Sequence, residues 1–229
     1  MQKHQHYDIA IIGSGITGLS TAYHLAQSKD LSICIAEDRE PNGASQASAN
    51  MVSGGLIDNF TRISQRHGFD YAKETWQYSH HAFDAIIEFA NREGLGAKLG
   101  SRIRLIETQD EFVECTKAID QLKQAGFPSD LTRALPVGAQ ALLGQQIDEP
   151  KAAVLDSRKL LEHLRALTKA SDRIGRIIAL QRESQHFTLT STGTQITAEI
   201  IILANHLEIP KFLPGLEGVL VSTQDQWLR

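Results

Sequence analysis

Cysteine is scarce in this sequence, with 2 residues in a chain of 229. Cys34 lies inside an apolar run and Cys115 lies on a predicted helix, and neither belongs to a C-x-x-C motif. The pattern therefore excludes a disulfide framework and a cysteine-ligated zinc site. A reducing cytoplasm is the compartment that such sparse cysteine usage favours.

Long apolar runs and a charge excess are also missing. No apolar run approaches the roughly 20 residues that cross a bilayer. The polar start MQKHQH leads directly into a predicted strand, so we do not expect a secretory signal. The net charge of −4 gives no electrostatic signature for nucleic acid or for an anionic membrane. We expect a cytoplasmic protein that binds neither.

A glycine-rich motif stands between two short apolar runs near the start of the chain. The first run, 8–12, predicts a buried parallel strand, and the second, 31–36, ends on the acid Glu37. Between them, residues 13–18 (GSGITG) fit G-x-G-x-x-G, and residues 16–27 show helical apolar spacing. The order predicts a strand, a tight turn, a helix and a second strand.

Each part of that motif has a physical role in holding a dinucleotide. Gly13 permits the tight turn, Gly15 lets backbone N–H groups approach a pyrophosphate, and Gly18 lets the helix lie against the strand. The positive end of the helix dipole then faces the phosphates. Glu37 lies at the distance along the chain where a carboxylate accepts hydrogen bonds from an adenosine ribose. The alternative is a glycine-rich turn in an ordinary α/β domain.

A loop of small and polar residues, 38–50, follows that acid. Its position places it at the carboxyl edge of the sheet, where ligands lie in doubly wound folds. Small side chains there let a flat ring or a phosphate chain lie against backbone. The hydroxyls of Ser45 and Ser48 can donate to phosphate oxygens.

The run GASQASAN at 43–50 resembles the second FAD-contact segment of the D-amino acid oxidase, glycine oxidase and sarcosine oxidase superfamily. The resemblance implies an α/β fold with a Rossmann-like FAD-binding domain of the glutathione-reductase type and an inserted, incomplete α+β substrate domain. Two departures stand out. Asn50 replaces a usual glycine, and Met51 follows where a second small residue is common.

The middle of the chain alternates helices with less regular segments. Residues 69–93 carry an apolar face at helical spacing, and 102–106 predicts a strand with one wet face. Thr108 and Glu111 match a capping box that starts a helix running to about residue 125. The resemblance assigns these elements to the substrate domain. We expect short helix and loop at 131–150.

The last third predicts a return to the FAD domain. A helix follows the polar pair at 156–157, and apolar runs come at 174–180, 187–190, 195–197 and 200–205. The resemblance places Ile177 beside the adenine and lets Ala204 and Asn205 touch the dinucleotide, with Asn205 at a usual glycine position. Asn tolerates a left-handed backbone there.

The expected division is 1–66 and 154–229 for the FAD-binding domain and 67–153 for a partial substrate domain. The expected cofactor-binding residues share the turn, the acid, the second contact segment and the return strands. They are Gly13, Ser14, Gly15, Ile16, Thr17, Gly18, Glu37, Asp38, Ala44, Ser45, Ser48, Asn50, Met51, Ile177, Ala204 and Asn205.

The resemblance implies an FAD-dependent oxidoreductase that transfers hydride from the CH–NH bond of an amine or amino acid to the flavin, or the FAD-binding portion of one. The groups that hold a substrate carboxylate in the family are not recognised here, so no catalytic residue is named, although His206 is the nearest candidate for a polar contact. We expect a partner polypeptide or self-association, whether the chain is a subunit, a truncation or a shortened relative.

Three other functions stay open. The run LGSRIRLIETQDE also resembles the FAD domain of the bifunctional tRNA methylaminomethyl-thiouridine biosynthesis enzyme, although no basic surface for tRNA is evident. An NAD(P)-linked dehydrogenase is the second, in which Arg39 would bind the 2′-phosphate of the cofactor. Against it, the carboxylate of Glu37 would repel that phosphate. A non-catalytic dinucleotide-binding or assembly subunit is the third.

Overall fold

The chain divides into two compact units, of which the first is built from two separate segments of the sequence and the second from one. The first combines Met1–Ala49 with Ser157–Arg229, and the second is Asn50–Asp156. The structure, a computed structural model, describes residues 5–28, 30–37, 43–132, 143–148, 151–168 and 172–220. The domain boundaries expected from the sequence stay a prediction.

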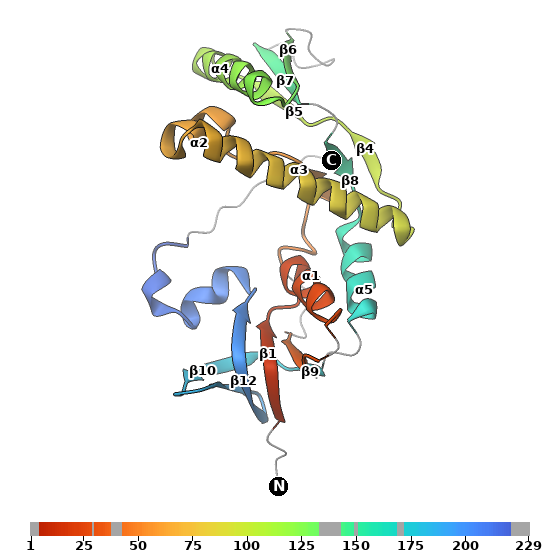
Figure 1. Ribbon diagram of the computed structural model, residues 1–229, viewed down its shortest axis with the longest axis vertical. Helices are drawn as coiled ribbons and strands as arrows, with labels where there is room; N and C mark the ends of the chain where they lie inside the picture. Colours follow the sequence, from red (N-terminus) through yellow and green to blue (C-terminus); the bar gives the residue numbers. More distant parts are fainter. Residues whose placement is uncertain are drawn as a thin grey trace. The chain divides into compact units, whose positions relative to one another are not determined.

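A six-stranded mixed sheet forms the first unit, in the order β10-β11-β12-β1-β2-β9. β1 pairs in parallel with β12 and with β2, and β2 pairs in parallel with β9, whereas β10, β11 and β12 form an antiparallel meander. Figure 1 shows β1 beside β12. The strands are β1 (Gln5–Ile12), β2 (Ile33–Ala36), β9 (Asp172–Ile174), β10 (Ile177–Arg182), β11 (Phe187–Ser191) and β12 (Thr194–Leu203).

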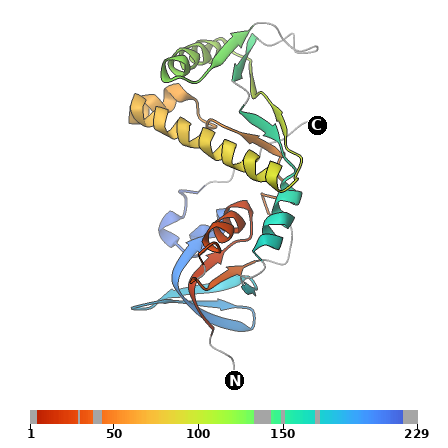
Figure 2. The same cartoon turned by 45° about the vertical axis from the view of Figure 1, so that its right-hand side comes forward.

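The predicted strand–helix–strand unit is present at the centre of this sheet. The side chains of Ile9, Ala10 and Ile11 are all buried, so β1 is covered on both faces, as a central parallel strand requires. α1 (Ile16–Leu25) buries Leu19 and Ala22 and packs beside α5 (Ser157–Leu167) (Figures 1 and 2).

β2 begins at Ile33, two residues later than its apolar run predicts. The cause is Ser32, whose backbone N–H and hydroxyl both donate to the carboxylate of Asp8, each at 2.6 Å. These hydrogen bonds tie the start of β1 to the chain that enters β2.

The return strands differ in one respect from the expectation. The runs 195–197 and 200–205 are not separate, because residues 194–203 form the single strand β12. β12 pairs with β11 in its first half and with β1 along most of its length, so the long ladder overrides the local break in hydrophobicity. Two 3₁₀ helices follow, η1 (His206–Lys211) and η2 (Pro214–Leu216).

The described part of the second unit contains three helices and two small sheets. α2 (Phe60–His67), α3 (Phe69–Arg92) and α4 (Gln109–Ala125) share a core in which Phe60 meets Trp76 edge to face. Farther along α3, Phe83 and Ile87 pack on Ala153 of β8. The expected apolar face of α3 is therefore confirmed, and so is the capping box of Thr108 and Glu111.

The first small sheet has the order β3-β8-β4 and the second β5-β7-β6, both antiparallel. Their strands are β3 (Met51–Ser53), β4 (Lys98–Gly100), β5 (Ile103–Ile106), β6 (Ser129–Thr132), β7 (Gly144–Asp148) and β8 (Ala152–Val154). The expectation of short helix and loop at 131–150 is wrong for β6 and β7. The sequence of β7 shows no apolar alternation that would predict a strand. Its extended conformation comes from pairing with β5 on one side and β6 on the other. Residues 133–142 and 149–150 lie outside the described residues.

β5 exposes the side of the strand that its sequence pattern would bury. Ile103 and Leu105 are 52% and 47% exposed, whereas Arg102 and Arg104 donate to the carbonyl oxygens of Leu56 and Ile57 at 3.1 and 3.2 Å. The arginines thus satisfy backbone oxygens of a neighbouring loop. Among the described residues, no helix has the length and hydrophobicity to span a membrane.

Candidate functional site

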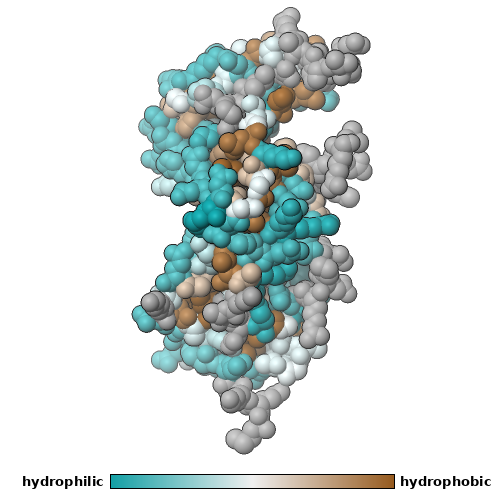
Figure 3. Space-filling view, turned by 90° about the vertical axis from the view of Figure 1, so that its right-hand side faces the viewer, coloured by the Kyte–Doolittle hydropathy of each residue, from teal (hydrophilic) through white to brown (hydrophobic). Residues whose placement is uncertain are grey.

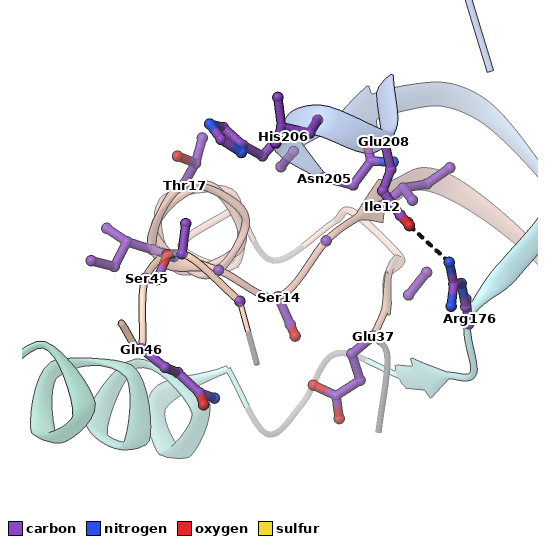
Figure 4. A pocket seen from close by; sticks show the side chains of 18 of the residues that line it. Ile12, Ser14, Thr17, Glu37, Ser45, Gln46, Arg176, Asn205, His206 and Glu208 are labelled. Carbon is purple, nitrogen blue, oxygen red and sulfur yellow. Dashed lines mark hydrogen bonds and ion pairs between the residues drawn. The ribbon is translucent and has the colours of Figure 1, made fainter. Parts of the chain in front are cut away.

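A cavity of about 900 Å³ opens in the first unit where its parallel strands end (Figure 4). The last residues of β1 and β2, Ile12 and Ala36, line it, as does Ala204, which follows β12. Backbone bonds hold these ends together: Gly13 N–H donates to the Ala36 oxygen at 3.0 Å, and Ala204 N–H donates to the Ile12 oxygen at 2.8 Å. The cavity therefore lies at the carboxyl edge, where doubly wound sheets bind ligands.

Backbone-to-backbone packing closes the glycine turn. Gly13 has φ +117°, and a Cβ on it would lie 2.5 Å from the carbonyl oxygen of Ala204. A Cβ on Gly18 would lie 1.9 Å from the carbonyl oxygen of Gly13. A side chain at Gly13 would clash with the residue that follows β12, and one at Gly18 would push α1 away from the turn. The tight turn expected at Gly13 and the close approach of the helix expected at Gly18 are therefore both present.

The N-terminus of α1 is capped by a residue from the loop that follows the acid. Gly15, at the N-cap, has no side chain to offer, and the backbone N–H of Ile16 donates instead to the hydroxyl of Ser45 at 3.1 Å. A Cβ on Gly15 would lie 3.0 Å from that hydroxyl oxygen. The Ser45 proton finds no acceptor among the described residues, so the hydroxyl is able to donate to an anion in the cavity.

Glu37 presents a carboxylate to the cavity directly after β2, as Figure 4 shows. Its Oε2 is buried and accepts no hydrogen bond from the described residues. The Nε of Arg165 and the Nη1 of Arg173 each lie 3.8 Å from it, near enough to balance the charge but too far to hydrogen-bond. Burial lowers the pKa of the Arg173 guanidinium; Glu37 opposes this shift and Arg165 adds to it.

An ion pair stands at another part of the cavity lining. Arg176 Nη2 donates to Glu208 Oε1 at 2.7 Å, the contact dashed in Figure 4. Ile177, the first residue of β10, also lines the cavity and is 5% exposed. Sequence reasoning missed Arg165, Arg176 and Glu208 as lining residues. One signal was available for Arg165, because it lies four residues after Leu161 on α5 and both line the cavity.

Asn205 carries two buried polar atoms in this cavity. Its side-chain nitrogen and oxygen both lack a partner among the described residues. Its backbone has φ −99° and ψ 24°, so the expected left-handed conformation is not found at this position. The left-handed residue is the next one, His206 with φ 51°, because the chain turns from β12 into η1 there.

Most expected cofactor-binding residues are brought together here. The cavity is lined by Gly13, Ser14, Gly15, Ile16, Thr17, Glu37, Ala44, Ser45, Ile177, Ala204 and Asn205. Gly18 and Ser48 do not line it. Asn50, left-handed with φ 63°, and Met51 belong to the second unit, and Asp38 lies outside the described residues. The binding role of all sixteen positions stays a prediction.

The arrangement suits one class of ligand. The N-terminus of α1 and the hydroxyl of Ser45 lie beside the bare backbone of the glycine turn. The carboxylate of Glu37, with its unpartnered oxygen, follows β2, and the apolar side chain of Ile177 completes the set. These groups complement a pyrophosphate, a ribose and an adenine. No cluster of His, Cys, Asp or Glu able to hold a metal occurs among the described residues. Fold and site together define a dinucleotide-binding domain.

Comparison with known families makes the class more specific. The family model described as FAD dependent oxidoreductase, named DAO, matches residues 8–226. The chain therefore belongs to this family of FAD-dependent oxidoreductases. The superfamily and the FAD cofactor expected from the sequence are confirmed, and the α/β fold class with them.

Individual relatives are more distant or match over short stretches. Hydrogen cyanide synthase subunit HcnC of Pseudomonas protegens is 44% identical over 52 residues, which is 23% of this chain and 12% of the relative. Glycine oxidase from Geobacillus kaustophilus has a TM-score of 0.67 at 18% identity, and L-proline dehydrogenase from P. horikoshii has 0.71 at 14%. These matches cover 93% and 96% of this chain but 59% and 57% of the solved structures. At such identities the likeness shows the fold.

Proposed function

We propose that the chain binds FAD in the cavity of the first unit and forms the FAD-binding portion of an oxidoreductase acting on the CH–NH bond of an amine or amino acid. One observation carries the proposal: two sets of buried, unpartnered polar atoms, on Glu37 and Asn205, line the same cavity as the glycine turn. Buried polar atoms without partners are uncommon and destabilising, so a ligand rich in hydroxyls and phosphate oxygens is their natural partner.

The residues have separate roles in holding the cofactor. Glu37 accepts hydrogen bonds from ribose hydroxyls through its free Oε2. The first-turn N–H groups of α1 and the hydroxyl of Ser45 donate to the pyrophosphate, and Ile177 supplies apolar contact for the adenine. Because the Ser45 oxygen already accepts a hydrogen bond from the N–H of Ile16, its O–H group is polarised, which makes it a stronger hydrogen-bond donor.

Bound FAD supplies the oxidation of the amine to an imine, a reaction that belongs to the cofactor itself. An amino-acid substrate is supported by the names of the structural neighbours, glycine oxidase and L-proline dehydrogenase. Their likeness is one of fold, so the particular amine belongs to the proposal alone. The chain's own contribution is to bind and orient the cofactor.

A flavin spectrum tests the cofactor first and the substrate second. The purified chain is incubated with FAD, separated from free cofactor, and scanned for bound flavin near about 450 nm. Retained flavin that bleaches on anaerobic addition of glycine, sarcosine or L-proline supports the whole proposal. Retained flavin without bleaching supports a binding portion only. A colourless chain that binds NADPH favours the NAD(P)-linked alternative.

We propose in addition that the chain works with another polypeptide or with a second copy. The name of the relative HcnC, a synthase subunit, supports this, as do exposed apolar side chains on the small sheets of the second unit. Met51 and Val154, which pair across β3 and β8, are 53% and 55% exposed, and Ile103 and Leu105 on the other small sheet are 52% and 47% exposed. Figure 3 shows apolar surface in several patches among hydrophilic side chains. A monodisperse monomer in light scattering, with full flavin occupancy and turnover, would contradict this part.

A further inference from the structure

Arg165 joins the two halves of the dinucleotide cavity. It lies in the last turn of α5, and its side chain is 37% exposed. Its Nη2 lies 3.5 Å from the hydroxyl of Ser14 in the glycine turn, and its Nε lies 3.8 Å from Oε2 of Glu37. Both distances are at or beyond the limit of a hydrogen bond, so most of its N–H donors stay uncommitted within the described residues.

The neighbouring cation behaves differently. Arg173 does not line the cavity, and its Nη2 donates to the fully buried hydroxyl of Thr168 at 2.7 Å. This bond fixes Arg173 behind Glu37, where its charge compensates the carboxylate. Two guanidinium groups thus face a single carboxylate, and the cluster keeps one surplus positive charge on the cavity side.

The other arginine that lines the cavity makes a direct carboxylate contact that Arg165 lacks. Arg176 donates to Glu208 Oε1 at 2.7 Å, and Lys211 Nζ lies 2.5 Å from the same oxygen. The guanidinium of Arg176 is therefore already held by a carboxylate, whereas that of Arg165 lies 3.8 Å from Glu37 and is available to an anionic ligand. The position of Arg165 over Ser14 places it beside the turn at which a pyrophosphate meets the N-terminus of α1.

On the proposed function, we infer that Arg165 is a phosphate-binding residue of this site. Its guanidinium donates to the pyrophosphate at the glycine turn while Arg173 stays with Glu37, which binds the ribose. Planar guanidinium groups match phosphate oxygens in geometry and form charge-assisted hydrogen bonds with them. The inference adds a side-chain cation to a turn that otherwise binds phosphate through backbone and hydroxyl groups.

Two ligands that differ in phosphate separate this role from a general structural one. ADP and adenosine are titrated calorimetrically into the full chain, and FAD affinity is measured by fluorescence. We expect Arg165→Met to raise the Kd for ADP and FAD by about tenfold to a hundredfold, as the loss of a charge-assisted bond implies, with the adenosine Kd within about twofold. Arg165→Lys, which keeps the charge but not the fork, should recover part of the loss.

Arg158→Met is the matched control, because Arg158 lies on the same helix and does not line the cavity; its affinities should equal those of the wild type. Circular dichroism and thermal melts check that each variant folds, and Arg165→Gln replaces Arg165→Met if the latter unfolds. Unchanged ADP affinity in the Arg165 variants would overturn the inference while leaving FAD binding intact, and so would an equal loss for ADP and adenosine. A wild-type chain that binds ADP but not FAD would instead overturn the proposed function, and one that binds neither overturns both.

Discussion

Replacing Gly18 by alanine sets helix propensity against packing, and the two predict opposite signs. Gly18 lies in the first turn of α1, where alanine would normally stabilise a helix by about 1 kcal/mol. The added Cβ would, however, lie 1.9 Å from the carbonyl oxygen of Gly13, against the 3.0 Å below which Cβ atoms essentially never approach. The helix and the turn must therefore separate by about 1 Å.

Neither partner can move without loss. The N–H of Gly13 is bonded to Ala36, and its Cα lies against the backbone of Ala204, so the turn is fixed on two sides. Overpacking costs about 1–3 kcal/mol, and the upper end applies here because the clash is with backbone that is fixed on two sides; after a gain in propensity of about 1 kcal/mol, a net loss of about 2 kcal/mol is left. For a chain of this size that corresponds to a fall in Tm of about 4–8 °C.

Thermal denaturation followed by circular dichroism measures the effect, and FAD titration follows the displacement of the N-terminus of α1. Gly175→Ala is the control, because its added Cβ would meet nothing within 4 Å and its φ is not positive. The control should change stability by no more than about 0.5–1 kcal/mol. If Gly18→Ala melts at or above the wild-type temperature and keeps its FAD affinity, the packing argument is refuted.

Four other perturbations test the ribose-binding role of Glu37, the pH-dependent hydrogen bonds of Asp8, the helix cap of Thr108 and the buried thiol of Cys115. Glu37→Gln should raise the Kd for FAD by about tenfold in fluorescence titration, because the hydrogen bonds to ribose lose their charge. Hydrogen bonds from Ser32 lower the pKa of Asp8, so the carboxylate stabilises the fold above pH 3.8 and this contribution is lost as pH falls through the lowered value; melts of Asp8→Asn should differ most from wild type at neutral pH and converge in acid. Thr108→Ala should lower stability by about 1 kcal/mol in denaturant melts, since it removes half of the capping box. Burial raises the pKa of the Cys115 thiol, so a disulfide reagent should label it at pH 8 only after unfolding.

Local sequence predicts the centre of the first unit well, because each signal there acts over a few residues. The spacing of the glycines, the helix of α1 and the acid after β2 follow from turn geometry and dihedral preference alone. The same holds for the capping box of α4, whose two hydrogen bonds join neighbouring residues. Such elements need no knowledge of the rest of the fold.

Elements whose conformation depends on residues far away in the sequence could not be predicted from local patterns. β7 is a strand because β5 and β6 flank it, and the single strand β12 is defined by its ladder with β1. The outward side of β5 depends on a loop forty-six residues earlier, which draws Arg102 inward. Arg165 faces the cavity because α5 packs on α1, a contact between residues far apart in sequence.

The position of the unpartnered atoms says more about this chain than their number. The unpartnered carboxylate oxygen of Glu37 and both amide atoms of Asn205 face a single cavity, and a folded chain loses about 1–3 kcal/mol for each buried group left in this way. The amide of Asn205 offers this cavity a donor and an acceptor that the glycine expected at this position would lack. Because binding would satisfy these groups only in the folded state, the empty chain is the less stable form. The Tm should therefore rise with FAD concentration and continue to rise beyond saturation, because the stabilisation grows as RT ln(1 + c/Kd), with c the free FAD concentration. On the proposed function, the atoms that weaken the unliganded fold would therefore couple its stability to the cofactor.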